Sequence, residues 1–156
     1  MNIWIKSSNT APTGNYHDPF CAYSTPASYE LSIYKTGYLR AGLNISGTRK
    51  VDNCTSTKLL DGNWHMITLT YDGATIKRYV DTVMEKSTAA TGTLTSPMNF
   101  AFGRYGSGTT YGSKEMSYSD ARFYATALTQ KQIEELYNTS MSIDKEGNIL
   151  VREVEE

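Results

Sequence analysis

The carboxylates of the chain are the first side chains to test for catalytic chemistry. Glycoside hydrolysis needs two carboxyl groups beside the scissile bond, about 5–5.5 Å apart in retaining enzymes. One strand supplies such a pair only from alternate positions, because neighbouring side chains point to opposite faces. Glu115 is followed on its face by Ser117 and Ser119. Glu30 and Glu85 are each solitary on their predicted strands. The sequence therefore predicts that the chain is not an enzyme.

The two histidines add little catalytic chemistry. His65 follows Trp64 at the start of a predicted strand, where a histidine is more often a hydrogen-bonded structural residue than a base. His17 and Asp18 fall in a predicted loop, and the sequence has no Gly-x-Ser-x-Gly turn to present a nucleophile beside them. Two histidines are too few for a histidine-based zinc site. The glycine-rich run 103–112 fits neither common phosphate-loop pattern.

Two predicted loops carry side chains of the kinds that hold sugars. Aromatic rings pack on the apolar face of a sugar, while amides, acids and arginine bond its hydroxyl groups. Loops 8–18 and 103–114 supply both kinds. If the loops meet at one edge of the fold they form a ligand site; otherwise they are ordinary polar loops. The candidate ligand-binding residues are Asn15, Tyr16, Asp18, Arg104, Tyr105 and Tyr111.

The composition indicates one globular domain and excludes several function classes. A chain of 156 residues can bury a core of its own. The net charge of −1 gives no reason to expect nucleic acid as a partner. No apolar run approaches the roughly 18 residues of a membrane helix. The 12 tyrosines, with many Ser, Thr and Gly, favour strands joined by polar turns, and tyrosine is also common on recognition surfaces.

Alternation of polar and apolar residues predicts many short strands. The Asp72-Gly73 pair between two of them predicts a two-residue type I′ hairpin turn, which needs positive φ at both central residues. Many strands with one late helix indicate an all-β antiparallel sandwich. The predicted strands are 2–7, 19–24, 29–35, 37–45, 48–55, 64–71, 75–81, 83–87, 98–104 and 115–125.

One helix is predicted at 130–138. Thr129 and Gln132 form a T-x-x-Q capping box, and Leu128 and Ile133 are spaced as a hydrophobic staple. Ile133, Leu136 and Tyr137 share one face at i, i+3 and i+4, by which the helix should lie against the sandwich.

Four segments of the sequence resemble those of a known protein family. The run "LLDGNWHMITLTYDGATIKRYVD" looks like the signature hairpin of the laminin-G-type jelly rolls of the concanavalin A-like lectin/glucanase superfamily. "IWIK" resembles the early strand of that family, and "FAFGR" a later one. "DARFYATALTQKQIEELYN" is similar to its closing strand and helix. The matches cover residues 3–138 and imply a concanavalin A-like jelly roll with one short helix near the C-terminus.

The chain departs from the family pattern in three places. Asp81-Thr82 replaces the usual Asp-Gly, and because a β-branched residue resists positive φ, we expect another turn type or a bulge. Arg78 stands where an apolar residue is usual, which predicts a wetter face or a contact with a neighbour. The opening strand, which in the family pairs beside the closing one, is missing.

Two explanations fit the missing strand. The chain is the C-terminal piece of a longer protein, cut just inside the domain, or a tail strand around 149–154 fills the vacant place. We therefore assign residues 1–140 to the jelly roll and 141–156 to a C-terminal tail that includes an extra strand. The tail sequence resembles endings of structural proteins from phages and prophages of Gram-positive bacteria.

Calcium is an open alternative that the resemblance implies, because several laminin-G-type relatives bind it. Ca²⁺ takes about six to eight oxygen ligands, and the acids here form no cluster. Asp61 and Asp72 are explained by their turns. Cys21 and Cys54 are expected as free buried thiols, with one bridge open in an oxidising compartment. The acids considered for calcium are Asp18, Asp52, Asp72, Asp81 and Asp120.

These observations favour a non-catalytic recognition domain. The expected function is lectin-like carbohydrate binding on a cell or virion surface, as part of a larger protein, with a glycan or another cell-surface ligand as partner. The alternative is a structural, protein-binding or oligomerisation domain of a phage tail or surface adhesin. An open sheet edge would favour this alternative, since it invites pairing with another segment or with a second copy of the chain.

Overall fold

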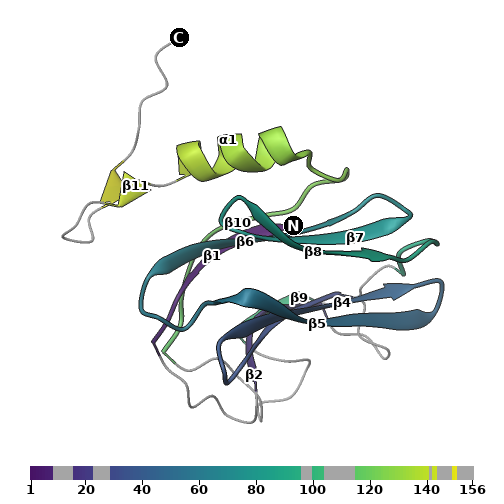
Figure 1. Ribbon diagram of the computed structural model, residues 1–156, viewed down its shortest axis with the longest axis horizontal. Helices are drawn as coiled ribbons and strands as arrows, with labels where there is room; N and C mark the ends of the chain where they lie inside the picture. Colours follow the sequence, from purple (N-terminus) through teal and green to yellow (C-terminus); the bar gives the residue numbers. More distant parts are fainter. Residues whose placement is uncertain are drawn as a thin grey trace.

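Two antiparallel sheets stacked face to face form the body of the molecule, and one helix covers the upper sheet in the view of Figure 1. The computed structural model describes residues 1–8, 16–22, 29–95, 100–103, 115–140, 142–143 and 149–150. The upper sheet of Figure 1 has the order β10 (Ser117–Arg122), β1 (Asn2–Lys6), β6 (Trp64–Tyr71), β7 (Thr75–Val80) and β8 (Val83–Ala89). The lower sheet has the order β5 (Thr48–Lys58), β4 (Tyr38–Ile45), β3 (Tyr29–Tyr34), β2 (Tyr16–Ala22) and β9 (Phe100–Phe102).

The core lies between the two sheets and is built by alternation along each strand. Every second side chain of a strand points inward, so each sheet contributes one apolar face. Fully burying one such side chain stabilises the fold by about 1.5–3 kcal/mol. The upper sheet supplies Ile3, Ile5, Ile67, Leu69, Ile76 and Val80, and the lower sheet supplies Phe20, Leu31, Ile33, Leu39, Ala41, Leu43 and Ile45.

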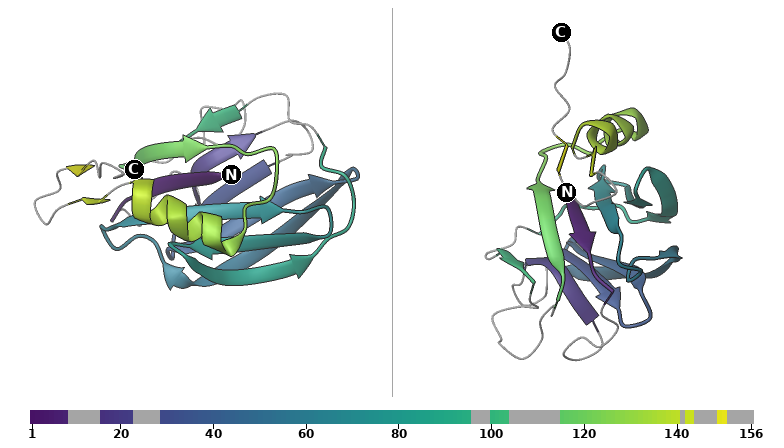
Figure 2. Two further views of the ribbon diagram at one scale, coloured as in Figure 1. Left: turned by 90° about the horizontal axis from the view of Figure 1, so that it is seen from above. Right: turned by 90° about the vertical axis from the view of Figure 1, so that its left-hand side faces the viewer.

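A second apolar cluster lies on the other face of the upper sheet, beneath helix α1 (Gln130–Ser140). Met66 and Ile133 are fully buried there, and the Trp4 and Tyr137 rings stack with centroids 5.2 Å apart. Both faces of β6 are therefore covered, one by the lower sheet and one by the helix. Figure 2 shows α1 lying over this sheet in both further views.

The helix begins as its sequence predicts. The Thr129 backbone N–H donates to Gln132 Oε1 at 2.9 Å, and the Gln132 N–H donates to Thr129 Oγ1 at 3.3 Å. These are the two reciprocal bonds of a capping box. Leu128 packs in the same cluster as Ile133, which confirms the staple. The helix extends two residues beyond the predicted 130–138.

The β6–β7 turn differs from the prediction. Tyr71 pairs with Ile76, so four residues, 72–75, lie between these paired residues rather than two. Gly73 has a φ of 93°, but Asp72 is not among the residues of positive φ. The Asp72 carboxylate instead accepts hydrogen bonds from the N–H groups of Ala74 and Thr75, at 3.0 and 2.7 Å. This side-chain closure holds a longer loop than a type I′ turn would, so the predicted turn was wrong.

The β7–β8 turn confirms the predicted irregularity. Asp81, with φ of 57°, takes the left-handed position, and Thr82 does not. Arg78 pairs with Lys86 and Tyr79 with Met84, so Glu85 is an extra residue on β8 and forms a bulge.

Arg78 is neither exposed to solvent nor directed away from the core. It is 1% exposed and lies between the two sheets, where Nη1 donates to the Leu39 carbonyl oxygen of β4 at 3.4 Å. The guanidinium therefore links the sheets at a position where other inward residues are apolar.

The tail forms a small sheet of its own in the described residues. β11 (Ser142–Ile143) pairs with β12 (Ile149–Leu150), and the partner described for β10 is β1. Ile149 lies in β12 and pairs with Ile143 of β11, not with β10. Residues 151–156 lie outside the described part. Within that part, no helix has the length and apolarity needed to span a membrane.

Candidate functional site

The structure places two of the six predicted ligand-binding residues. Tyr16 and Asp18 belong to β2, which begins three residues before its predicted start, so they lie on a strand rather than in a loop. Asp18 is only 2% exposed, so its carboxyl group is not offered to a ligand directly. Asn15, Arg104, Tyr105 and Tyr111 lie outside the described residues.

Tyr16 is the first member of a row of three tyrosines that crosses the outer face of the lower sheet. Tyr16 pairs with Tyr34 on β3, and their ring centroids are 5.1 Å apart. The pairing of Ile33 with Leu39 brings Tyr38 of β4 opposite Tyr34. Because Leu31, Ile33 and Leu39 point into the core, the alternate tyrosines point away from it. All three, here called the tyrosine row, are partly exposed.

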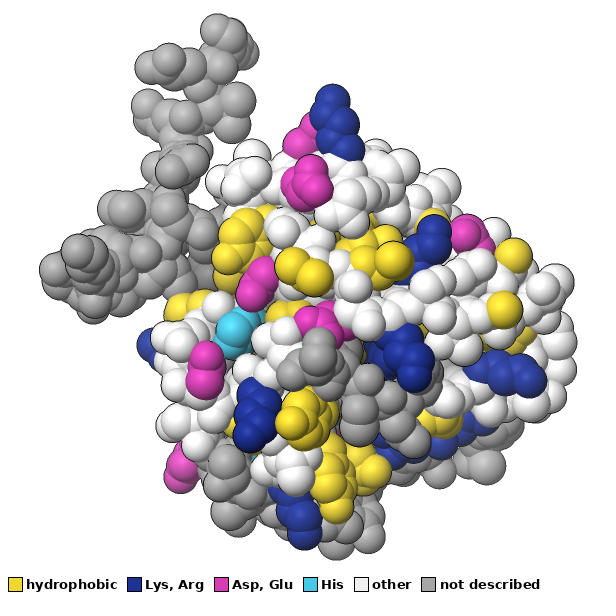
Figure 3. All heavy atoms as spheres, viewed as in Figure 1, with side chains coloured by type: hydrophobic (Ala, Val, Ile, Leu, Met, Phe, Trp, Pro, Cys, Tyr) yellow, Lys and Arg dark blue, Asp and Glu magenta, His cyan; other side chains and the backbone are white. Residues whose placement is uncertain are grey.

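A cation lies against each ring of the row. The Arg40 guanidinium is 5.0 Å from the Tyr16 centroid. Lys35 Nζ is 5.9 Å from the Tyr34 centroid, and Lys58 Nζ is 6.0 Å from that of Tyr38. These distances fall within the roughly 6 Å over which a ring attracts a cation. Figure 3, which shows one face of the molecule, has many of its Lys and Arg side chains in the lower half, on the side of the lower sheet.

A buried ionic network lies beside the row and fixes Arg40. Glu30 is 2% exposed and accepts a hydrogen bond from Arg49, while Arg40 Nη1 lies 3.6 Å from Glu30 Oε1. Gly42 leaves room for this network, because a Cβ at position 42 would lie 3.2 Å from Glu30 Oε2 and the carboxylate would have to shift slightly. Arg40 is thus held by a carboxylate on one side and by the Tyr16 ring on the other.

Asp18 joins this network through a shared hydroxyl. Ser32 Oγ is 2.7 Å from Asp18 Oδ1 and 2.8 Å from Glu30 Oε1. Burial raises the pKa of Asp18 to about 6, with Glu30 adding to the rise and Ser32 and Arg40 opposing it. One hydroxyl proton serves one acceptor, so a protonated Asp18 can donate to Ser32 Oγ while Ser32 donates to Glu30.

This network shows what the sequence reasoning missed. Glu30 is solitary along its own strand, but the β2–β3 pairing brings Asp18 to the other side of the same serine. The two acids therefore form a cross-strand pair. Both are 2% exposed, and Glu30 is held by two arginines, so the geometry stabilises charge beneath the surface. A search across strands for Tyr, Arg and Glu at alternate positions could have found the row and its support.

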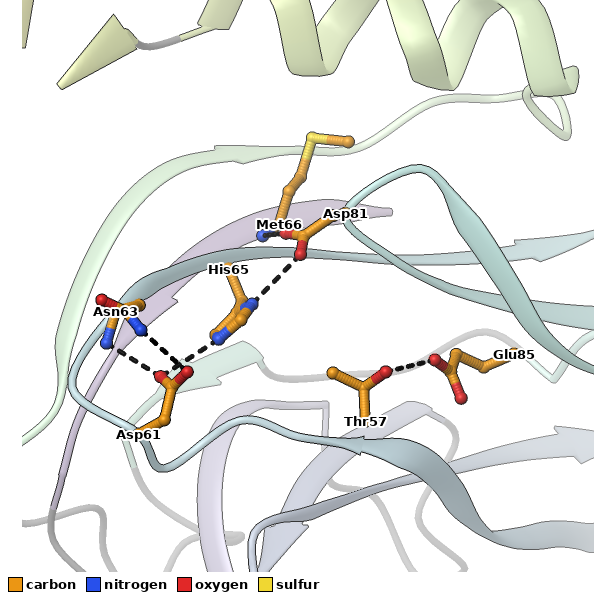
Figure 4. A network of polar contacts seen from close by, with 7 residues as sticks. All are labelled: Thr57, Asp61, Asn63, His65, Met66, Asp81 and Glu85. Carbon is orange, nitrogen blue, oxygen red and sulfur yellow. Dashed lines mark hydrogen bonds and ion pairs between the residues drawn. The ribbon is translucent and has the colours of Figure 1, made fainter.

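His65 has a structural role, as its position beside Trp64 predicted (Figure 4). Its Nδ1 lies 3.1 Å from Asp81 Oδ2, and its Nε2 lies 3.2 Å from Asp61 Oδ1. Asp81 Oδ1 also accepts the Met66 N–H at 3.0 Å, and Asp61 is held by Asn63. The hydrogen bond to Asp81 is the main cause that raises the pKa of His65. The ring thereby ties the loop before β6 to the β7–β8 turn.

Figure 4 also shows a hydrogen bond that joins the two sheets at one side. The Thr57 hydroxyl of β5 donates to Glu85 of β8 at 2.5 Å (Figure 4). Glu85 is the bulged residue of β8, so the bulge directs its carboxylate toward the lower sheet.

In the residues that the structure describes, no three His, Cys, Asp or Glu side chains are grouped to hold a metal ion. Asp61 and Asp72 cap turns, Asp81 binds His65, and Asp120 pairs with Arg122. The side chains of Asp52, Cys21 and Cys54 fall outside the described set, so the calcium and thiol predictions stay predictions.

A cavity of about 200 Å³ opens at one end of the sandwich. Tyr29, Leu69, Leu94 and Leu128 line it together with Phe123 and Tyr124, which are 53% and 36% exposed. Its lining is mainly apolar, and no residue of the tyrosine row lines it.

Taken with the sheet order, these observations define the class of protein as an antiparallel jelly-roll β-sandwich with tyrosines and cations on one outer sheet face. A sequence model described as the concanavalin A-like lectin/glucanases superfamily matches residues 1–134, and the chain belongs to this family. No curated protein sequence matches the chain.

Solved structures of similar fold include receptor-binding domains of bacterial toxins. The chain is similar to the receptor binding domain of botulinum neurotoxin D, with 16% identity and a TM-score of 0.72, over 96% of this chain and 40% of that one. It is also similar to the binding domain of botulinum neurotoxin DC in complex with SialylT, with 15% identity, a TM-score of 0.71, and coverage of 96% and 38%. The binding domain of Paraclostridial mosquitocidal protein 1 gives 14%, 0.66, and coverage of 89% and 36%. The chain thus spans about two-fifths or less of these relatives.

Proposed function

We propose that the chain is a non-catalytic recognition domain that binds carbohydrate through the tyrosine row. The observation that carries this proposal is the set of three partly exposed rings, Tyr16, Tyr34 and Tyr38, side by side on one sheet face. Ring faces pack on the apolar side of a sugar, and the row offers several such faces without loop movement. Rigid strands hold the rings in place before any ligand arrives, which limits the entropy lost on binding.

The cations complete this surface. Arg40, Lys35 and Lys58 each lie beside one ring and carry only hydrogen-bond donors. Sugar hydroxyl oxygens accept such bonds while the ring below packs on C–H groups. One solved neighbour was determined in complex with SialylT, and the cell entry of another, botulinum neurotoxin type C, is described as dependent upon interaction with two ganglioside molecules. Both support a glycan as the ligand class.

The proposed setting is outside the cell or on a virion surface, within a larger protein. We propose residues 1–140 as the jelly-roll unit and 141–156 as an appended tail. The toxin domains that share the fold are receptor-binding domains, which supports a surface location, and each is longer than the part that this chain matches.

A glycan array tests the proposal. The purified chain is applied with and without calcium, and Tyr34→Ala is compared with Tyr124→Ala, which removes a partly exposed tyrosine far along the chain. Selective binding that Tyr34→Ala weakens roughly three- to tenfold, and Tyr124→Ala leaves unchanged, would support the tyrosine row; one aromatic contact is worth about 0.5–1.5 kcal/mol beyond its buried area. Silence across the array, with or without calcium, would refute it.

The second candidate is a structural or protein-binding unit, including the tail-protein setting that the C-terminal sequence suggests. The observation that favours it is an exposed aromatic group at the β9–β10 side. Phe102 and Phe123 are 49% and 53% exposed, and both contact Phe20, with centroids 5.6 and 5.0 Å away. A silent glycan array together with a stable oligomer in solution, dissociated by Phe123→Ser, would favour this candidate.

A further inference from the structure

We propose that the tyrosine row selects an acidic sugar, one that carries a carboxylate or a sulfate, over the neutral sugar of the same backbone. This inference rests on the proposed function and adds the class of ligand to it. It is carried by the positions of the charged side chains around the row.

The charges that a ligand would meet on this face are positive. Lys35 and Lys58 are exposed, and Arg40 is partly exposed. The facing acids, Asp18 and Glu30, are each 2% exposed. Glu30 is further neutralised by Arg49 and Arg40, which lie against its two oxygens. Among the described residues of this face, the cations therefore reach the surface and the carboxylates lie beneath it.

The two lysines converge at one end of the row. Lys35 lies in the turn between β3 and β4, and Lys58 pairs with Tyr38 at the end of β5. Gly37 joins these segments, because its carbonyl oxygen accepts the Leu59 N–H at 2.9 Å and its own N–H donates to the Tyr34 carbonyl at 2.7 Å. With φ of 95°, Gly37 holds a backbone conformation that a side chain would strain. The fold thus places two ammonium groups beside Tyr34 and Tyr38.

This arrangement distinguishes sugars by charge. A sugar packed on Tyr34 or Tyr38 gains the same ring contact whether neutral or acidic. An acidic substituent adds charge-assisted bonds to Lys35 and Lys58, which are stronger than bonds to a hydroxyl. Because the lysines are exposed, each adds a modest factor of about two- to fivefold, and salt weakens it.

The experiment uses an array that carries matched neutral, carboxylated and sulfated forms of the same glycans, read at about 20 mM and about 300 mM NaCl, where the Debye length falls from roughly 20 Å to below 8 Å. The double variant Lys35→Gln/Lys58→Gln is compared with Lys6→Gln/Lys131→Gln. The control has the same net charge but changes β1 and α1.

The expected result is binding to acidic forms over their neutral matches, weakened by salt and reduced roughly tenfold by the first double variant but not by the control. A preference for carboxylated or for sulfated forms alone identifies the source of the charge and supports the inference. Equal binding of neutral and acidic forms overturns it and leaves the proposed function standing. Equal losses in both double variants also overturn it, since net charge rather than the row would select. Silence on every glycan overturns the proposed function together with this inference.

Discussion

The buried carboxyl group of Asp18 should contribute stability at low pH that is lost as pH rises, and Asp18→Asn should remove this contribution. Asp18 is 2% exposed and lies beside Glu30, and burial raises its pKa from 3.8 to about 6. The folded state therefore binds this proton more tightly than the unfolded state does. The stabilising contribution is fully present below the unfolded value of about 3.8 and is lost as pH rises through about 6.

The size of the effect follows from the pKa difference. A change of about two pKa units corresponds to about 3 kcal/mol of unfolding free energy between pH 3.5 and pH 7.5. Asparagine has nearly the shape of aspartic acid, and its amide oxygen can accept the Ser32 hydroxyl that lies 2.7 Å from Asp18 Oδ1. Relative to the wild type, Asp18→Asn should therefore gain about 3 kcal/mol on passing from pH 3.5 to pH 7.5.

Urea unfolding at a series of pH values measures this difference, and ¹³C NMR of the Asp18 carboxyl measures the titration directly. Ser32→Ala is the matched variant, because the serine hydrogen bond lowers the Asp18 pKa and its loss should raise the NMR midpoint above that of the wild type. Stability curves of the wild type and Asp18→Asn that run parallel from pH 3.5 to 7.5, with a carboxyl midpoint near 4, would refute the reasoning.

Two further predictions concern the upper sheet. The pKa of His65 is raised by Asp81, so its contribution is present below the unfolded value of about 6.5 and lost as pH rises through the higher folded value. His65→Gln should remove this dependence, which solvent screening limits to about 1 kcal/mol, in urea unfolding between pH 6 and 8.5. Ile133 is fully buried under α1, and Ile133→Ala should lower the unfolding free energy by about 2–4 kcal/mol with the capping box intact. An exposed control, Glu134→Ala, should change it by less than about 0.5 kcal/mol, and equal losses in the two variants would contradict the assigned packing.

The elements that depend on neighbours in the chain were predictable from the sequence. The capping box needs only Thr129 and Gln132, three residues apart, and the structure contains both of its bonds. The alternation along 64–71 likewise predicted a strand, and β6 spans the same residues. The prediction for the β6–β7 turn was wrong because Asp72 can close either a two-residue or a longer loop. Its hydrogen bonds to Ala74 and Thr75 select the longer loop.

The candidate site depends on pairing between strands, which no local pattern contains. Tyr16 was predicted as a loop residue of a ligand site. Its place in the tyrosine row instead follows from its pairing with Tyr34, which was not considered. Glu30 was judged by its own strand alone, where it has no second acid. The register of β2 against β3 makes Asp18 its neighbour, and the register of β4 against β5 brings Arg49 to its carboxylate. A shift of either register by one residue would turn these side chains to the opposite face.

The buried network and the exposed row are coupled through Arg40. This guanidinium lies 5.0 Å from the Tyr16 centroid and 3.6 Å from Glu30 Oε1, and its charge also opposes the rise in the pKa of Asp18. When Asp18 binds a proton below about pH 6, one negative charge disappears from beneath the row while Arg40, Lys35 and Lys58 keep theirs. Protonation of Asp18 therefore contributes stability and makes the proposed binding face more positive through the same carboxyl group. A surface that holds an acidic ligand by these cations therefore gains attraction as Asp18 binds its proton.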